Sequence, residues 1–189
     1  MPICESGAHM TDRMAQGDRG AIAQPADFLT GDWIMTRRIR FRGRAPRGSL
    51  DGCASVRADG QHSSLNEQGL LRLDGREAMA SQRYVLTFRG AVVQVHFRNG
   101  SFFHEFELHR SGYTAIYHCG ADQYVGRYRV LDCDVWSLIW CVRGPRKDYD
   151  MRTLYRRVAG PSQIERTSRP FTFAQATGGG LDRSSVADV

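Results

Sequence analysis

Residues 83–109 read RYVLTFRGAVVQVHFRNGSFFHEFELH, and this stretch carries the clearest signal for the fold. Apolar and polar side chains alternate through three successive runs, at 83–89, 91–98 and 101–109, as they do in half-buried strands. The pair Asn99-Gly100 separates the second run from the third, and Asn-Gly is typical of a two-residue hairpin turn. The stretch therefore predicts consecutive antiparallel strands.

Similar runs continue in both directions along the chain. Further expected strands cover 33–42, 49–58, 63–73, 113–118, 123–131, 135–143 and 149–158. No convincing amphipathic helix lies between them. About ten short strands at this spacing predict an all-β fold, an antiparallel up-and-down β-barrel or, as the alternative, a sandwich. A barrel is favoured because closure leaves no long exposed strand edges.

The two ends of the chain differ from its middle. Residues 1–26 are rich in Gly, Ala, Asp, Arg and Gln without any periodicity, so we expect a disordered leader. The Gly- and Ser-containing stretch 160–189 is expected to be a flexible tail, which leaves 27–159 as the barrel. The segment Gly7–Met10 resembles a cloning scar, so His9 enters no site hypothesis.

Composition argues against several classes of protein. The chain has no apolar run near the roughly 20 residues that span a membrane. Residues 1–24 lack the apolar segment of a secretory signal peptide, so we expect a cytoplasmic protein with no membrane partner. The five cysteines are odd in number and contain no C-x-x-C pair, which argues against a disulfide framework and a structural zinc site.

The formal charge of +6 and the pI near 9.4 raise the question of a nucleic-acid partner. Every basic residue except Lys147 is an arginine, and the arginines are spread along the whole chain. The dense run at 37–47 would alternate between the two faces of a strand and form no single stripe. We therefore do not expect a nucleic-acid partner. A basic face that binds protein or RNA ranks last among the functions considered. The oligomeric state is left open, with a homodimer as one option.

The first expected strand opens with Gly31-Asp32-Trp33, directly after the short stretch Ala26–Leu29. This resembles the opening of lipocalins, in which a helical turn leads into Gly-x-Trp. The resemblance implies that Trp33 packs at the closed end of the barrel beneath an arginine from a late strand. Arg156 and Arg157 are the candidates for that arginine.

Three further segments are distinctive. They read FFHEF at 102–106, HCGADQY at 118–124 and WCVRGPRKDY at 140–149. Together they resemble a family of small, uncharacterised bacterial and fungal proteins that carries a label of unknown function and is calycin-like. The resemblance covers about residues 28–157, with GPRKDY its most specific part. It implies a lipocalin- or calycin-like barrel and names no reaction.

Arg37 is the first candidate site residue. Side chains alternate between lumen and solvent in a small barrel, so Arg37 points inward if Trp33 and Met35 do. An inward arginine would bind a carboxylate or enolate of a ligand, because a buried cation without an anion is costly. The alternatives are an ion pair with a carboxylate of the protein or a bulge that shifts the register.

His104 shares its expected face with Phe102 and Phe106, which would contact a ligand in the lumen. One interpretation is a neutral imidazole held in the core by a hydrogen bond. The other is a general acid or base, for which an imidazole near neutral pKa is suited.

His118 and Asp122 lie on either side of a glycine-containing turn. A carboxylate there could orient the imidazole by accepting its ring N–H, which would make both residues catalytic candidates. The alternative is that Asp122 only caps the amides of its own turn. Tyr124 and Tyr128 share the next strand face and could donate hydrogen bonds to a ligand carbonyl, or serve as ordinary wall aromatics.

Two more residues complete the candidate ligand contacts. Trp140 adds a large apolar surface, and Lys147 should lie in a loop at one barrel end, either at the mouth of a site or in an exposed ion pair. The histidines show no recognised metal-ligand spacing, so no metal is expected. Phosphate-loop, dinucleotide, zinc-protease and serine-hydrolase motifs are also absent from the sequence.

The residues support a ranked set of functions. The first is a barrel that binds a hydrophobic or aromatic small molecule with an acidic or carbonyl group, without a cofactor. The second is a cofactor-independent isomerase or cyclase in which His104 or His118 moves a proton while Arg37 or Tyr124 stabilises negative charge. The third is a haem-binding barrel, because a single axial histidine needs no motif.

Overall fold

The computed structural model describes residues 21–43 and 47–159. The expected tail at 160–189 and most of the expected leader at 1–26 lie outside these residues. Within the described part of the chain, no helix is long and apolar enough to cross a membrane.

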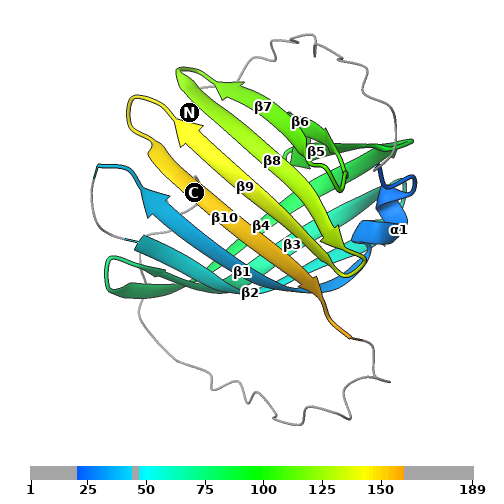
Figure 1. Ribbon diagram of the computed structural model, residues 1–189, viewed down its shortest axis with the longest axis horizontal. Helices are drawn as coiled ribbons and strands as arrows, with labels where there is room; N and C mark the ends of the chain where they lie inside the picture. Colours follow the sequence, from blue (N-terminus) through cyan, green and yellow to red (C-terminus); the bar gives the residue numbers. More distant parts are fainter. Residues whose placement is uncertain (1–20, 44–46, 160–189) are drawn as a thin grey trace. The chain divides into compact units, whose positions relative to one another are not determined.

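One short helix and ten strands make up the described chain (Figure 1). They are α1 (Pro25–Leu29), β1 (Gly31–Phe41), β2 (Arg47–Asp59), β3 (His62–Leu73), β4 (Arg76–Arg89), β5 (Val92–Phe97), β6 (Phe102–Glu107), β7 (Tyr113–Cys119), β8 (Asp122–Asp132), β9 (Val135–Arg143) and β10 (Asp148–Arg157). Each strand expected from the alternation pattern is present. The all-β fold class is confirmed.

All ten strands belong to one antiparallel sheet in the order β6-β5-β4-β3-β2-β1-β10-β9-β8-β7. The strands follow one another as a meander, and the first strand, β1, pairs with the last, β10. Figure 1 shows β1 and β10 to β8 lying across β2 to β4. The sheet edges β6 and β7 are consecutive in sequence, and no ladder joins them among the described strands. The sheet is an up-and-down barrel that is nearly closed.

Strand β4 begins well before the expected position 83. Its first half, Arg76–Gln82, contains helix-favouring residues and no clear alternation of apolar side chains, which hid the strand from sequence analysis. This half pairs with β3 on one side only, because the ladder between β4 and β5 begins at Tyr84. The inward side chains there, from Ala78, Ala80 and Gln82, are partly exposed.

The ladder between β5 and β6 contains an irregularity that changes which side chains face inward. Val95 pairs with His104 while its neighbour His96 pairs with Phe102, so Phe103 is the extra residue of a bulge. Phe103 and His104 are both buried as a result. The expectation that Phe102 faces the lumen is wrong, because the bulge leaves its side chain 41% exposed, edge-on to the outer His96 ring.

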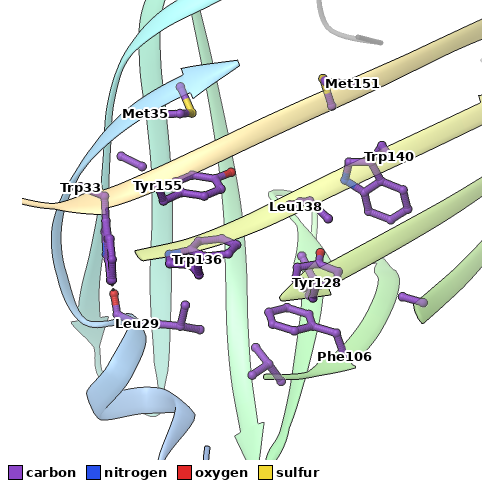
Figure 2. Packing of buried hydrophobic residues seen from close by; sticks show 14 of the residues in the cluster. Leu29, Trp33, Met35, Phe106, Tyr128, Trp136, Leu138, Trp140, Met151 and Tyr155 are labelled. Atoms are coloured by element: carbon purple, nitrogen blue, oxygen red, sulfur yellow. Dashed lines mark hydrogen bonds between the residues drawn. The ribbon is translucent and has the colours of Figure 1, made fainter. Parts of the chain in front are cut away.

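The chain ahead of β1 covers one end of the barrel, here called the α1 end. The Ile22 amide donates to the Leu108 carbonyl at 2.8 Å, and Pro25 at the start of α1 is buried. The expected leader 1–26 includes both residues, because the polar composition around them hides the two apolar side chains from sequence analysis. The indole of Trp33 is fully buried and donates to the Leu29 carbonyl at 2.9 Å (Figure 2).

Arg157 closes the same end from the last strand. Its guanidinium lies 4.2 Å from the centre of the Trp33 ring, a cation–π distance. It also donates to the carbonyl oxygens of Phe28 and Thr30, and it forms an ion pair with Asp134 at 2.9 Å. The arrangement implied by the lipocalin resemblance is present, with Arg157 and not Arg156 above the tryptophan.

Candidate functional site

Aromatic side chains line the interior at the end of the barrel away from α1, the far end. We define the far-end cluster by six residues from six strands: Tyr84, Phe97, Phe103, Tyr117, Tyr124 and Trp140. The ring centroid of Phe103 is 4.7 Å from that of Phe97 and 5.5 Å from that of Trp140. All members except Phe103 and Trp140 remain partly exposed although they face inward.

The partial exposure follows from the strand pairing. The first half of β4, which pairs with β3 but not with β5, borders the cluster, and the turn between β5 and β6 lies beside it at Phe97 and Phe102. Among the described strands β6 and β7 form no ladder anywhere along their length, so the wall between Phe103 and Tyr117 lacks strand hydrogen bonds. Within the described part of the chain, Tyr84, Phe97, Tyr117 and Tyr124 of the far-end cluster remain partly exposed.

Trp140 forms the inner boundary of the far-end cluster. Its indole lies against the backbone of β8 because position 126 is glycine, and a Cβ at Gly126 would come within 2.8 Å of the ring. The indole stacks on Phe103 and stands edge-on to His104, with ring centroids 5.0 Å apart. His104 therefore lies directly behind the cluster.

A buried charge network crosses the barrel interior. Arg37 faces inward, as expected, and its Nη2 donates to a Glu67 carboxylate oxygen at 2.7 Å. Its Nε donates to the Thr153 hydroxyl at 2.9 Å. The Tyr155 hydroxyl donates to the other oxygen of Glu67. Both charged side chains are at least nine-tenths buried, so the pair is internal and balanced.

The cost of burying a charge explains why Arg37 is paired with Glu67. Burial by itself lowers the pKa of Arg37, but the neighbouring Glu67 carboxylate outweighs that effect and raises the pKa above the ordinary arginine value. Arg37 is therefore always charged, and Glu67 serves as its counter-ion. The hydrogen bonds of Arg37 use its Nε and Nη2 atoms. Among the described residues its Nη1 atom has no hydrogen-bond partner, so the N–H groups of that atom are not engaged.

His104 and Tyr128 form a second buried polar pair. The His104 Nε2 atom lies 2.6 Å from the Tyr128 hydroxyl oxygen, and the imidazole is only 4% exposed. Burial lowers the pKa of His104 to about 3, so the ring is neutral. Burial also raises the pKa of Tyr128 well above its ordinary value, with Tyr155, Tyr84 and Glu67 adding to the effect.

The position of the histidine proton follows from a count of hydrogen-bond partners. If Tyr128 donates to Nε2, the proton of the neutral ring sits on Nδ1 and one polar atom lacks a partner. If Nε2 donates instead, the tyrosine hydrogen and Nδ1 both lack one. The first arrangement is therefore favoured. Within the described part of the chain Nδ1 is buried without a partner, which costs about 1–3 kcal/mol.

The outer rim of the far end carries a third polar group. Lys147 donates to the Tyr124 hydroxyl at 2.8 Å, and its ammonium lies 3.6 Å from Asp122. Burial raises the pKa of Tyr124, while the hydrogen bond and charge of Lys147 partly oppose that shift. The three residues join β8 to the turn that follows β9, so Lys147 lies at the far end of the barrel.

The structure does not bring His118 and Asp122 together. They pair with Gln123 and Cys119 respectively, so their side chains point to opposite faces of the β7–β8 hairpin. His118 is exposed on the outer face. Apart from Phe102 and the loop residue Lys147, the remaining candidates face inward, and Phe106 stacks on Tyr128 with ring centroids 3.8 Å apart. The expectation of a His118–Asp122 pair is thus wrong, because the turn pairs Cys119 with Asp122, and His118, the neighbour of Cys119, points to the opposite face.

Several residues of the interior were missed from sequence: Tyr84, Phe97 and Tyr117 of the far-end cluster, and also Glu67, Tyr155 and Phe103. Glu67 lies among polar neighbours in β3, yet it alternates in phase with the inward Leu65 and Leu71, which was the available signal. Tyr155 alternates in phase with Met151 on β10 in the same way. Phe103 carried no signal, because a bulge breaks the alternation. Within the described residues, no group of three or more His, Cys, Asp or Glu side chains could hold a metal ion.

Comparison with known proteins identifies the sequence family and the fold. Residues 29–157 match the sequence profile of a family of unknown function, DUF6314. No curated protein matches the chain.

Among solved structures, an S-type phycobiliprotein lyase from Guillardia theta is similar over 75% of this chain and 95% of its own, with 8% identity and a TM-score of 0.55. A protein of unknown function from the DUF3598 family of Nostoc punctiforme has 11% identity and a TM-score of 0.49, over 70% of this chain and 48% of its own. A de novo designed fluorescence-activating β-barrel has 13% identity and a TM-score of 0.40, and the match covers 72% of this chain and 99% of its own. At these identities the likeness concerns the fold.

Proposed function

The chain belongs to the family of unknown function DUF6314, and from this starting point we propose that its barrel binds a small, largely apolar molecule. The ligand lies in the interior at the far end, against the far-end cluster, and carries a carbonyl or acidic group. His104, Tyr128, Trp140 and Phe106 form the inner part of this site, and Tyr124 and Lys147 lie at its mouth.

One observation carries the proposal: inward-facing aromatic rings at the far end are partly exposed. At the α1 end, by contrast, Trp33 and Trp136 are almost fully buried. Ligand sites combine accessible apolar surface with a few convergent polar groups. Tyr84, Phe97 and Tyr117 supply that surface, and the polar groups behind it face the same interior.

The fold is compatible with the proposal and does not select a ligand. One protein with this barrel is a phycobiliprotein lyase, but at 8% identity nothing about its activity transfers. The ligand class has to be argued from the side chains of this chain.

The geometry supports binding ahead of catalysis. A general base works best when its pKa lies near the working pH, whereas burial lowers the pKa of His104 to about 3. No carboxylate contacts the imidazole among the described residues, and His118 is outside the barrel. An isomerase that uses His104 as a base would have to raise that pKa on binding its substrate.

The proposal is tested with prodan, a neutral naphthyl ketone whose fluorescence reports an apolar site. Prodan is titrated into the wild type and into two tryptophan variants of β4. Ala80→Trp places an indole inside the barrel at the far end, whereas Ser81→Trp places one on the outer face of the same strand. We expect A80W to weaken prodan binding about tenfold or more and S81W to leave it unchanged.

Equal binding by both variants would contradict an interior site. Thermal unfolding of the two variants is measured in parallel, so that a loss of binding in A80W is read only if the protein is folded. An absorption scan of the purified wild type accompanies the titration, and a Soret band would favour haem as the ligand.

A further inference from the structure

The charges inside the barrel already balance. Among the described residues, Arg37 and Glu67 are the two buried charged side chains, and they neutralise one another through a 2.7 Å ion pair. Glu67 also accepts the Tyr155 hydroxyl, so both of its oxygens are engaged within the protein. The cation that could have attracted an acidic ligand therefore has its own counter-ion.

A carboxylate brought into this interior would carry an uncompensated negative charge. Burial of a charge without a partner is strongly unfavourable, and the ligand would compete with Glu67 for the same guanidinium. At the rim, Lys147 is likewise held next to Asp122 at 3.6 Å. Neither the Arg37–Glu67 pair inside the barrel nor the Lys147–Asp122 pair at its rim therefore favours the binding of an anion.

A neutral acceptor meets a different environment. The His104 Nδ1 atom is buried and has no partner in the described chain, and the hydrogen-bond count places a proton on it. The imidazole contacts Trp140 and Phe103, both members of the far-end cluster. A ligand that enters from the cluster and displaces the Phe103 or Trp140 ring would reach the imidazole.

We infer that the site takes an uncharged ligand whose carbonyl oxygen accepts a hydrogen bond from His104 Nδ1, and that it discriminates against the matching carboxylate. This inference rests on the proposed function. It narrows the ligand from a molecule with a carbonyl or an acidic group to an uncharged molecule with a carbonyl group. It replaces the expectation that Arg37 binds a ligand carboxylate. Arg37 instead holds Glu67, and through it Tyr155, in place.

The test uses three probes built on one ring system. They are prodan, dimethylaminonaphthalene, which lacks the carbonyl, and dimethylaminonaphthoate, which is ionised at pH 8 and replaces the ketone by a carboxylate. Dissociation constants for the wild-type protein are measured by fluorescence at pH 8. We expect prodan to bind about tenfold more tightly than either of the other probes, which corresponds to one hydrogen bond or one unpaired charge.

Two variants assign the preference to His104. The double variant H104F/Y128F removes the imidazole N–H donor together with the Tyr128 hydroxyl, which would otherwise lose its partner. In this variant prodan and dimethylaminonaphthalene should bind with about equal affinity. The control His96→Phe changes a histidine on the outer face of neighbouring β5, where it faces Thr87, and should keep the preference.

A third variant tests the charge balance. Glu67→Gln keeps the shape of the side chain but leaves Arg37 without its anion. We expect E67Q to bind dimethylaminonaphthoate about tenfold more tightly than the wild type does, with little change for prodan. If E67Q does not fold, the wild-type comparison of prodan with the naphthoate decides the question.

The possible outcomes separate the two claims. Tight binding of prodan that depends on His104 supports the inference. Binding of the naphthoate as tight as that of prodan overturns the inference while the proposed function stands. Equal binding of prodan and dimethylaminonaphthalene overturns it as well. If none of the three probes binds, the proposed function fails and the inference fails with it.

Discussion

The two ends of the barrel are built from the same kinds of residue but are packed differently. At the α1 end, Trp33, Trp136 and Leu108 are almost completely buried beneath the helix and Arg157. At the far end, Tyr84 and Phe97 also face inward, yet they remain partly exposed. Figure 2 shows Trp33 and Trp136 beside α1, with Trp140 at the opposite side of the core.

Aromatic content alone therefore does not identify a binding site. What separates the ends is how many chain segments cover them. Among the described residues, helix α1 and the segment with Ile22 close one end, while at the other end the first half of β4 pairs with β3 alone. The α1 end should therefore govern stability and the far end should govern binding.

Loss of the buried indole at the α1 end gives the largest expected effect. Trp33→Ala should lower the free energy of unfolding by about 4 kcal/mol, because it removes a fully buried ring and the stacking partner of Arg157. Urea unfolding followed by circular dichroism measures the change. A loss below about 1 kcal/mol would show that the α1 end is not the stabilising half.

The charge network between the ends comes next. Arg37→Met should destabilise the protein by about 3 kcal/mol, because it leaves Glu67 charged and buried without a counter-ion. The double variant R37M/E67L should recover most of that loss. Urea unfolding of both variants is the measurement, and equal losses in the single and double variants would contradict the role assigned to the pair.

Acidification provides a third, smaller effect. An unfolded histidine titrates near 6.5, whereas the pKa of His104 in the folded protein is about 3. The unfolded state therefore binds more protons below pH 6.5, and stability should fall as the pH falls. Between pH 6.5 and pH 5 we expect a loss of about 2 kcal/mol.

Variants isolate this contribution. The loss should be absent from His104→Phe and present in His96→Phe, as measured by urea unfolding at each pH. Identical pH profiles for the wild type and H104F would contradict a neutral, buried His104.

The smallest effect on stability is expected at the far end. Phe97→Ala should cost only about 1 kcal/mol of stability, because the ring is partly exposed, but it should weaken prodan binding about tenfold. Unfolding and titration of the same sample check both values. If F97A destabilises as strongly as W33A and binds prodan normally, the two ends are not divided as described.

Much of the barrel could be predicted from period-two alternation. The strand with Trp136, Leu138 and Trp140 shows it most clearly, because each of these residues is apolar and faces the core. The pattern failed at Arg76–Gln82, where the inward residues are small or polar. It also failed at Phe103, since a bulge depends on the backbone and leaves no trace in composition.

The site was harder to predict than the fold. Arg37 and His104 follow from their phase within alternating strands. Their partners Glu67 and Tyr128 lie far away in sequence, and which of two inward side chains meet across a barrel depends on strand tilt and shear. The Glu67 counter-ion of Arg37, on which the proposed ligand class depends, could therefore be found only in the three-dimensional structure.

The most direct test of an interior ligand site is a crystal structure of the protein with prodan bound. The account predicts the naphthalene ring among Tyr84, Phe97 and Tyr117, with the ketone oxygen within hydrogen-bond distance of His104 Nδ1. Prodan seated only on the outer face of the barrel, or at the α1 end beside Trp33, would contradict it.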